Sequence, residues 1–383
     1  MYILIVASWY KNAENPVAGS FIEEQARMLQ RRGHTVAVLH AYINGTFRDT
    51  LSGKNELFTE EDDNGILTMR LSTNVYVPKI RSLSYSRLCR KALKHVRNYI
   101  RSNGKIDVIH SHAMFMGGIV ANYLSRKLSI PYFHTEHTSG FIFHPEQYTS
   151  ADIQLAKKVY EQSRQSFFVS HFAKERIAKL CGVSENNCSV LHNVVSPLFF
   201  EKYDCQKFDH FTFLAIGNFI PLKNFDKIIE AWSSYVRNKQ DDRLIIVGDG
   251  PLKLNIENSI KTLNLTDSVE MLPRQSREET ALLMHKSHVV LSASSIETFG
   301  MTLAEALASG IPVISTKSGG VTDIVNYYNG ILLDSISAEA IEKGMAEMRE
   351  KYSMYEPAVL KNYANERFSE EAIYKQLIGE YNV

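Results

Sequence analysis

The sequence predicts an α/β protein that contains two doubly wound parallel sheets. Short runs rich in Val, Ile and Phe alternate with helix-period segments, which is the rhythm of repeated βαβ units. The rhythm breaks once, in VVSPLFFEKYDCQKFDH at 194–210, and then starts again. A chain of 383 residues also exceeds what one hydrophobic core usually serves, so two domains of ordinary size are expected.

The first series of elements begins at the first residues of the chain. Strands are predicted at 3–7, 36–40, 108–111, 132–135, 167–170 and 189–192. Helices are predicted at 19–32, 84–103, 116–127, 151–163 and 171–180. The opening MYILIVASWY has no basic leader and is short, so we expect a buried strand rather than a signal peptide.

The second series follows the break. Strands are predicted at 211–216, 243–247, 268–272, 288–292 and 312–315, each followed by a helical stretch. The final FSEEAIYKQLIGEYNV has helical spacing of its apolar residues, with Ser369 as the N-cap.

Composition indicates a soluble globular protein. Hydrophobic residues make up 44% and charged residues 22%, and the net charge of +1 gives no overall attraction to nucleic acid. The four cysteines show no Cys-x-x-Cys spacing, which argues against a zinc site or a disulfide framework. No run approaches the roughly 20 apolar residues of a membrane span, and we expect a cytoplasmic protein.

The most informative motif is SSIETFGMTLAEALASGIPVISTKSGGVTDIV at 294–325. A strand passes through Gly300 into a helix, and the free N–H groups of a helix start favour an anion such as phosphate. Glu297 precedes the helix and Glu305 lies within it, so the two carboxylates should reach different parts of one extended ligand. Taken alone, the pair also fits a capping acid and a solvated acid.

This motif, E-T-F-G-M-x-L-A-E-A-L-A-S-G-x-P-V-I-S-T followed by G-G-V-x-D-I-V, resembles the donor-site signature of retaining family 4 glycosyltransferases. The resemblance implies that Glu297 lies against the donor sugar as a catalytic residue and that Glu305 binds the ribose. It also implies that backbone amides around Phe299, Gly300 and Met301 face the sugar and the diphosphate.

The same resemblance implies the GT-B fold, in which two Rossmann-like domains face a central cleft. The C-terminal helix would cross back to the N-terminal domain, although the residues alone also allow it to pack only on the second domain. The predicted domains are an acceptor domain at 1–196, a nucleotide-sugar donor domain at 205–367 and the C-terminal helix at 368–383.

A second motif, LAIGNFIPLKNFDKIIEAW at 214–232, resembles the family's strand, G-R-L-x-x-x-K-G loop and helix. Gly217 matches the glycine and Lys223 the phosphate lysine. Asn218 replaces the usual arginine, and it can form hydrogen bonds but carries no charge. Arg274 could supply that charge or be an ordinary surface arginine, and it is not included in the predicted site.

A third segment, IIVGDGP at 245–251, resembles a family strand and turn near the nucleotide. Gly248 is its predicted site residue. As a dinucleotide-binding fingerprint the segment fails, because the third glycine is missing.

Two predicted site residues belong to the first domain. In the loop SWYKNAENPVAGSF, Gly19 matches a family glycine near the donor phosphates, and Pro16 allows a bent path. In IPYFHTEHTSGF, His137 matches the position of a family active-site histidine, although a histidine at a strand end is by default structural.

We expect neither a metal ion nor a cofactor. His110, His112, His134 and His137 lack a recognisable ligand spacing, because strand alternation puts His134 and His137 on different faces. The sequence also contains no Asp-x-Asp motif. Lys223 and helix amides would then stabilise the leaving diphosphate.

The implied reaction moves a sugar from a nucleotide diphosphate sugar, a UDP- or GDP-sugar, to a hydroxyl. The acceptor would be a saccharide or a lipid-linked saccharide in cell-surface polysaccharide or glycolipid synthesis. Two alternatives remain open: a nucleotide-sugar epimerase or hydrolase of the same fold, and a catalytically silent sugar-nucleotide-binding subunit.

The main basic segment, at 79–105, contains nine Lys or Arg and no acid. Its apolar residues form one helical stripe: Tyr85, Leu88, Ala92, Val96 and Tyr99. Such a helix can contact an anionic membrane at its inner face, or it can pack on the core with a solvated basic face. Its basic side has no stacking aromatics, so no nucleic acid partner is expected.

Overall fold

The computed structural model of the chain describes residues 1–12, 15, 17–52, 56–77, 80–239 and 241–382. They divide into two compact units: Met1–Val194 together with the residues from Tyr374 onward, and Val195–Ile373. Each unit contains a sheet of its own, so the predicted α/β class with two sheets is confirmed.

The first sheet has the strand order β3-β4-β2-β1-β5-β6-β7-β8, and only the β3–β4 pair is antiparallel. Its strands are β1 (Tyr2–Ala7), β2 (Thr35–Ile43), β3 (Phe58–Asp63), β4 (Ile66–Thr73), β5 (Val108–His112), β6 (Tyr132–Glu136), β7 (Gln165–Phe168) and β8 (Cys188–Val190). The β3–β4 hairpin was not predicted, because β3 reads FTEEDD and is largely exposed.

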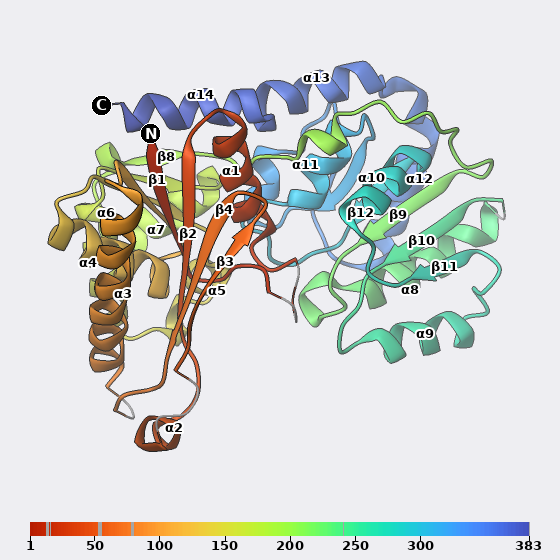
Figure 1. The fold of residues 1–383 in the computed structure, drawn as a ribbon. Helices are drawn as coiled ribbons and strands as arrows, with labels where there is room; N and C mark the ends of the chain where they lie inside the picture. Colours follow the sequence, from red (N-terminus) through yellow and green to blue (C-terminus); the bar gives the residue numbers. More distant parts are fainter. Residues whose placement is uncertain (13–14, 16, 53–55, 78–79, 240, 383) are drawn as a thin grey trace. The chain divides into compact units, whose positions relative to one another are not determined.

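The helices of the first unit are α1 (Ser20–Arg31), α2 (Phe47–Ser52), α3 (Arg81–Asn103), α4 (Ile119–Leu128), α5 (Ser139–Phe143), α6 (Ser150–Gln162) and α7 (His171–Cys181). The helices α3, α4 and α6 lie next to one another and pack on the first sheet (Figure 1). The helix predicted from 116 begins only at Ile119, because Ala113 and Met116 turn the chain with φ values of 64°.

The second sheet is parallel throughout, in the order β11-β10-β9-β12-β13-β14. Its strands are β9 (Thr212–Ile216), β10 (Arg243–Val247), β11 (Val269–Leu272), β12 (Val289–Ser292), β13 (Val313–Thr316) and β14 (Gly330–Leu333). The strand order reverses between β9 and β12, and ligands of doubly wound sheets bind beyond the carboxyl ends at this switch point.

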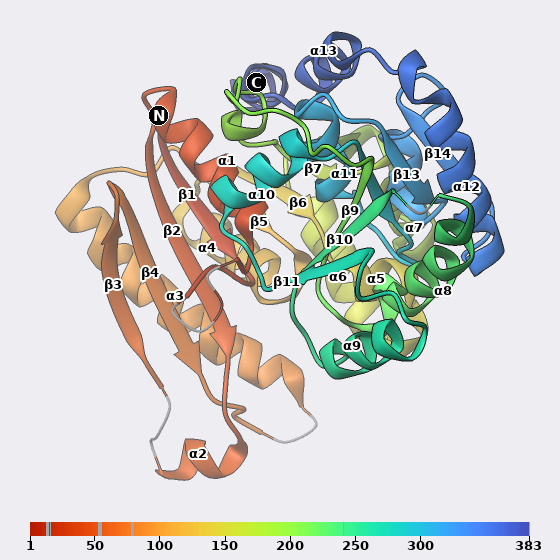
Figure 2. The ribbon, with the colours of Figure 1, turned by 90° about the vertical axis from the view of Figure 1, so that its right-hand side faces the viewer.

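The helices of the second unit are α8 (Phe225–Tyr235), α9 (Lys253–Thr262), α10 (Arg277–Lys286), α11 (Met301–Ala308), α12 (Ala338–Lys351) and α13 (Pro357–Phe368). Figure 2 shows α8 beside α12, where they cover an apolar cluster that includes the fully buried Trp232. Outside that cluster, α11 packs against α13.

The last helix, α14 (Glu370–Tyr381), starts at the predicted N-cap, where the Ser369 hydroxyl accepts a hydrogen bond from the Ala372 N–H at 3.3 Å. From Tyr374 onward its residues belong to the first unit. There the Gln376 side chain donates to the Val190 carbonyl at 2.6 Å, and the Tyr381 hydroxyl bonds the His110 ring. The predicted crossing of this helix to the N-terminal domain is confirmed.

Candidate functional site

Loops that follow the strands of the second sheet are joined to one another at its carboxyl edge. The Phe219 N–H donates to the Asp249 carbonyl at 2.8 Å, and the Ser295 N–H donates to the Leu222 carbonyl at 2.9 Å. The Gly320 N–H donates to the Glu297 carbonyl at 2.9 Å. Segments far apart in the sequence therefore form one continuous edge around the switch point.

Gly217 and Gly248 lie against each other in this edge. The Gly217 N–H donates to the Val247 carbonyl at 3.0 Å. A Cβ atom on Gly248 would lie 2.0 Å from the Gly217 carbonyl oxygen, so no larger residue fits without a backbone shift.

Lys223 and Glu297 form an ion pair across the switch point. Lys223 ends a short 3-10 turn, and the Asn224 side chain ties this turn to the Ala293 carbonyl at 2.7 Å. The side chains of Lys223 and Glu297 are 25% and 20% exposed, so both remain within reach of a ligand. The structure thus brings together two predicted site residues from different loops.

The start of α11 supplies the remaining predicted positions of the second unit. Gly300 precedes the helix with a left-handed φ of 110°, and Met301 and Glu305 lie one turn apart on the same face. The Phe299 ring is buried edge-on against Phe368 at 5.6 Å, so this residue offers its backbone rather than its side chain.

Two arginines that follow β11 lie at the same edge: Arg274 in the connection and Arg277 at the first residue of α10. Arg274 donates to the Asn218 side chain at 3.0 Å, although it was left out of the predicted site. Arg277 lies 3.5 Å from Glu305, whose side chain is 13% exposed. One sequence signal could have located Arg277: the capping box formed by Ser276 and Glu279 starts α10 directly after β11.

In the first unit, Gly19 adopts the left-handed φ of 65° just before α1, and a Cβ there would lie 2.9 Å from the Trp9 carbonyl oxygen. Pro16, in the same loop, lies outside the described residues. His137 is buried, with its Nε2 3.0 Å from Nδ1 of His112 and its ring 4.4 Å from that of Phe21. Within the described ranges, no group of three or more His, Cys, Asp or Glu side chains could hold a metal ion.

Glu136, which sequence reasoning missed, holds the backbone that carries His137. Its carboxylate accepts the N–H groups of His137 at 2.8 Å and Thr138 at 2.7 Å, and the Tyr160 hydroxyl at 2.7 Å. Burial acts to raise the pKa of Glu136, but hydrogen bonds from His134 and these neighbours hold that pKa at about 2. A buried, charged carboxylate therefore fixes this loop.

Comparisons with known proteins decide the family. Residues 18–197 match the model described as Glycosyltransferase Family 4, and residues 206–367 match that described as Glycosyl transferases group 1. An uncharacterized glycosyltransferase of Methanocaldococcus jannaschii is 31% identical over 274 residues, which cover 71% of this chain and 73% of that protein. The chain belongs to the family 4 glycosyltransferases. It transfers a sugar from a nucleotide sugar.

Further similarities are more distant. The alpha-monoglucosyldiacylglycerol synthase of Streptococcus pneumoniae is 25% identical over 261 residues, which cover 62% of this chain and 56% of the synthase. The crystal structure of Anabaena HepE in complex with UDP superposes with a TM-score of 0.76 at 16% identity over the full length of both chains. This likeness confirms the predicted GT-B fold. Across the described part of the glycosyltransferase, we find no helix with the length and apolarity needed to cross a bilayer.

The Gly248→Ala variant of the glycosyltransferase should separate the two loops that meet at Gly217. We expect it to lower the free energy of unfolding by about 1–3 kcal/mol, because the methyl group has no room. Thermal unfolding measures the loss, and Gly379→Ala is the matched control, since a Cβ there meets nothing within 4 Å. Equal melting temperatures for the two variants would contradict the close contact.

The stability of the glycosyltransferase should fall in mild acid. Burial lowers the pKa of His137 to about 3 and those of His110 and His112 well below the usual value. These rings are neutral when folded but bind protons when unfolded below a pH of about 6.5. Their contribution to the free energy of unfolding is complete above that pH. Below it, each ring should lower this free energy by up to about 1.4 kcal/mol per pH unit.

Urea unfolding between pH 7.5 and 5 measures this slope, in a window above the ordinary titration of carboxylates. The His137→Gln variant, which removes one of the rings, should show a shallower decline than the wild type. A free energy of unfolding that stays constant over this range would contradict the neutral buried state of the histidines.

Proposed function

We propose that the protein is a retaining, metal-independent hexosyltransferase that uses a UDP- or GDP-sugar and acts in cell-surface polysaccharide or glycolipid synthesis. Its acceptor is a hydroxyl of a saccharide or of a lipid-linked saccharide. The single observation that supports this most is the Lys223–Glu297 pair beside the start of α11 at the switch point. The name of the streptococcal relative, alpha-monoglucosyldiacylglycerol synthase, favours glycolipid synthesis.

In this proposal the second unit binds the donor. The diphosphate takes Lys223 away from Glu297 and accepts the first N–H groups of α11, where the helix dipole favours an anion. Arg274 stands beside Asn218 and supplies the charge that Asn218 lacks. Glu305 binds the ribose, and its neighbour Arg277 orients the carboxylate.

The first unit is proposed to bind the acceptor and to carry His137. Because burial keeps this histidine neutral, it would act by hydrogen bonding rather than as a cation. The acceptor hydroxyl attacks the anomeric carbon from the same face that the diphosphate leaves, and the leaving diphosphate accepts the proton of that hydroxyl. The anomeric configuration is therefore retained without a carboxylate nucleophile. Lys223, Arg274 and the amides of α11 stabilise the developing charge.

The basic helix α3 is proposed to contact anionic membrane at the cytoplasmic face. Its predicted apolar stripe is packed on the core, with Leu88 and Val96 fully buried. On its basic face, Arg87 and Lys91 pair with Glu56. Lys79 lies outside the described residues.

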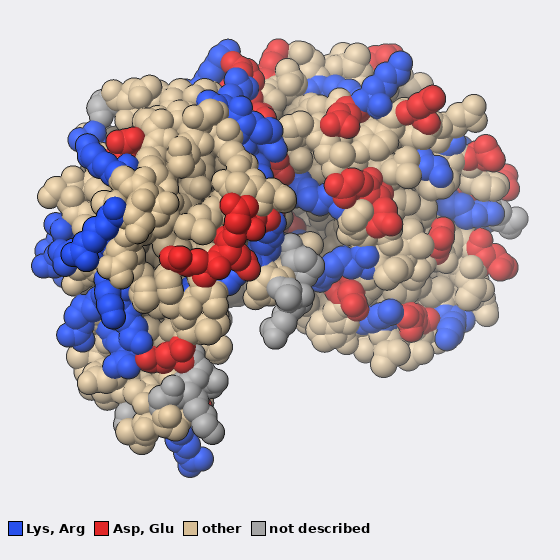
Figure 3. All heavy atoms as spheres, in the orientation of Figure 1, with Lys and Arg blue, Asp and Glu red and all other residues tan. Residues whose placement is uncertain are grey.

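Arg81 lies 3.5 Å from Asp152, and the remaining cations of α3 are exposed and make no ion pair within the described ranges: Arg90, Lys94, Arg97 and Arg101. Figure 3 shows blue side chains gathered over the α3 side of the first unit. Exposed cations on one face attract anionic lipid at low ionic strength.

One assay distinguishes the candidate reactions. The protein is incubated with a panel of nucleotide sugars without acceptor, and both the nucleotide and the sugar are followed by chromatography. Slow release of a nucleotide diphosphate from one donor is the result expected of a transferase. An isomerised donor would instead indicate an epimerase, and binding without turnover would indicate a silent subunit.

A further inference from the structure

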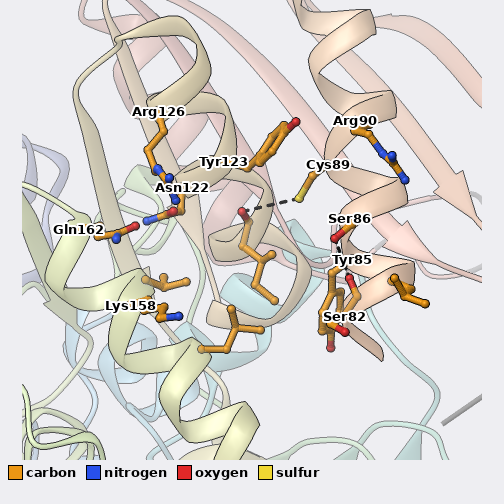
Figure 4. A pocket seen from close by; sticks show the side chains of 14 residues that line it. Ser82, Tyr85, Ser86, Cys89, Arg90, Asn122, Tyr123, Arg126, Lys158 and Gln162 are labelled. Carbon is orange, nitrogen blue, oxygen red and sulfur yellow. Dashed lines mark hydrogen bonds between the residues drawn. The ribbon is translucent and has the colours of Figure 1, made fainter. Parts of the chain in front are cut away.

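A cavity of about 650 Å³ lies between α3, α4 and α6 of the first unit (Figure 4). Its apolar lining includes Ile119, Leu155 and Val159, from α4 and α6. Its volume is within the range of cavities that hold drug-sized ligands. This cavity has no part in the donor site described above.

The cavity follows from small residues on α3. Ser82 and Ser86 stand one turn apart in its lining, and the Ser86 hydroxyl donates to the Ser82 carbonyl of its own helix at 2.9 Å. These short side chains therefore do not fill the space toward α6. An adjoining cavity of about 690 Å³ shares Ser82, Tyr85, Leu155 and Lys158 with the first, so the space continues toward the starts of α3 and α6.

Each of the three helices contributes one cation to the lining: Arg90 from α3, Arg126 from α4 and Lys158 from α6. No Asp or Glu lines this cavity, and the one acid that lines the adjoining cavity, Asp152, pairs with Arg81 at 3.5 Å. Throughout the described residues, these three cations have no hydrogen-bond or ion-pair partner, in contrast to Arg87 and Lys91 on the same α3.

Asn122, also in the lining, has a buried Nδ2 without a hydrogen-bond partner. Figure 4 shows it between Arg126 and Gln162. A buried donor without an acceptor costs free energy, and an anionic oxygen in the cavity would satisfy it. The cavity thus combines an apolar surface with donors that all suit a negative group.

We propose that this cavity binds one anionic phospholipid. An acyl chain occupies the apolar space, and the phosphate lies among Arg126, Lys158 and the Asn122 amide, while Arg90 adds positive charge from the opposite side of the lining, beyond Cys89. A purely polar anion would leave the apolar lining uncovered, and a neutral lipid would leave the cations without a counter-charge. The proposal deepens the membrane contact proposed for α3 and does not depend on the sugar-transfer reaction.

The test is isothermal titration of the full chain with dihexanoylphosphatidylglycerol below its micelle concentration. We expect binding that falls about 15-fold for the dibutanoyl analogue, because the chain in the cavity is two methylenes shorter and each buried methylene contributes roughly fourfold in affinity. Glycerophosphoglycerol, which has the head group alone, and zwitterionic dihexanoylphosphatidylcholine should bind at least tenfold more weakly.

Two variants address the cavity itself. Ser86→Trp fills the cavity from an exposed position, and Arg90→Gln/Arg126→Gln/Lys158→Gln removes its cations. Each should weaken binding at least tenfold. The matched control Lys94→Gln/Arg97→Gln/Arg101→Gln removes as many charges from exposed positions of α3 outside the lining and should change the affinity less than twofold. Thermal melts verify that every variant is folded.

Three outcomes would overturn the proposal: no binding of the dihexanoyl lipid, equal binding of the head group alone, or equal losses in the cavity triple and the control triple. Sedimentation with phosphatidylcholine vesicles containing phosphatidylglycerol, at low and high salt, tests the membrane contact separately. Binding of the soluble lipid without binding to vesicles would support the lipid site in the cavity and refute the membrane contact through α3. Failure of the nucleotide-sugar assay would refute the reaction and leave the lipid result intact.

Discussion

Replacing Glu297 with Ala should reduce sugar transfer at least about 100-fold while nucleotide diphosphate affinity changes less than about threefold. The loss is of the size seen when one group that stabilises a transition state is removed. Affinity should persist because Glu297 is proposed to contact the sugar, and because its removal frees Lys223 from the ion pair. Nucleotide release and calorimetric titration measure the two effects.

Glu230→Ala is the matched control for Glu297→Ala, since Glu230 also pairs with a lysine, Lys227, but is 59% exposed on α8. It should leave turnover within twofold. If the Glu297 variant retained turnover, or lost nucleotide affinity to the same degree as turnover, the assignment of Glu297 to the sugar would be wrong.

Replacing Lys223 with Ala should weaken nucleotide diphosphate binding about 10- to 100-fold. A charge-assisted hydrogen bond of about 1.5–3 kcal/mol is lost, and Glu297 is left as an unpaired acid beside the diphosphate. Binding of the nucleoside without phosphates should be almost unchanged. Calorimetric titration of both ligands separates the charge effect from damage to the loop.

For Lys223 the control is Lys227→Ala, an exposed lysine on the adjacent helix. The loss of diphosphate affinity in Arg274→Ala should lie between those of the two lysine variants, because Arg274, which donates to Asn218, is more exposed than Lys223. Equal affinities of the Lys223 and Lys227 variants for the diphosphate would remove Lys223 from the site.

The helices and strands were predictable wherever the local sequence pattern indicates them. Continuous apolar runs identified the buried strands, and the Gly300 junction marked the start of α11. The β3–β4 hairpin was missed because its edge strand is acidic, although Asn64-Gly65 between the strands, both at positive φ, is a strong hairpin signal. The four-residue β14 was also missed.

The contacts of the site were harder to predict because they depend on strand order. That Lys223 meets Glu297 follows from β9 lying beside β12, which no local pattern reveals. Likewise Arg274 reaches Asn218 from the connection after β11 across the neighbouring β10 loop. Family resemblance proposed roles for single residues, whereas the contact of Arg274 with Asn218 and that of Arg277 with Glu305 are seen only in the structure.

The most direct measurement is a crystal structure with the nucleotide sugar that the panel assay selects. We expect the diphosphate within hydrogen-bond distance of Lys223 Nζ and the first N–H groups of α11, and the ribose hydroxyls at the Glu305 carboxylate. We also expect the Lys223–Glu297 pair to be opened by the ligand. A nucleotide bound elsewhere, with that pair intact, would contradict the donor site proposed for the second unit.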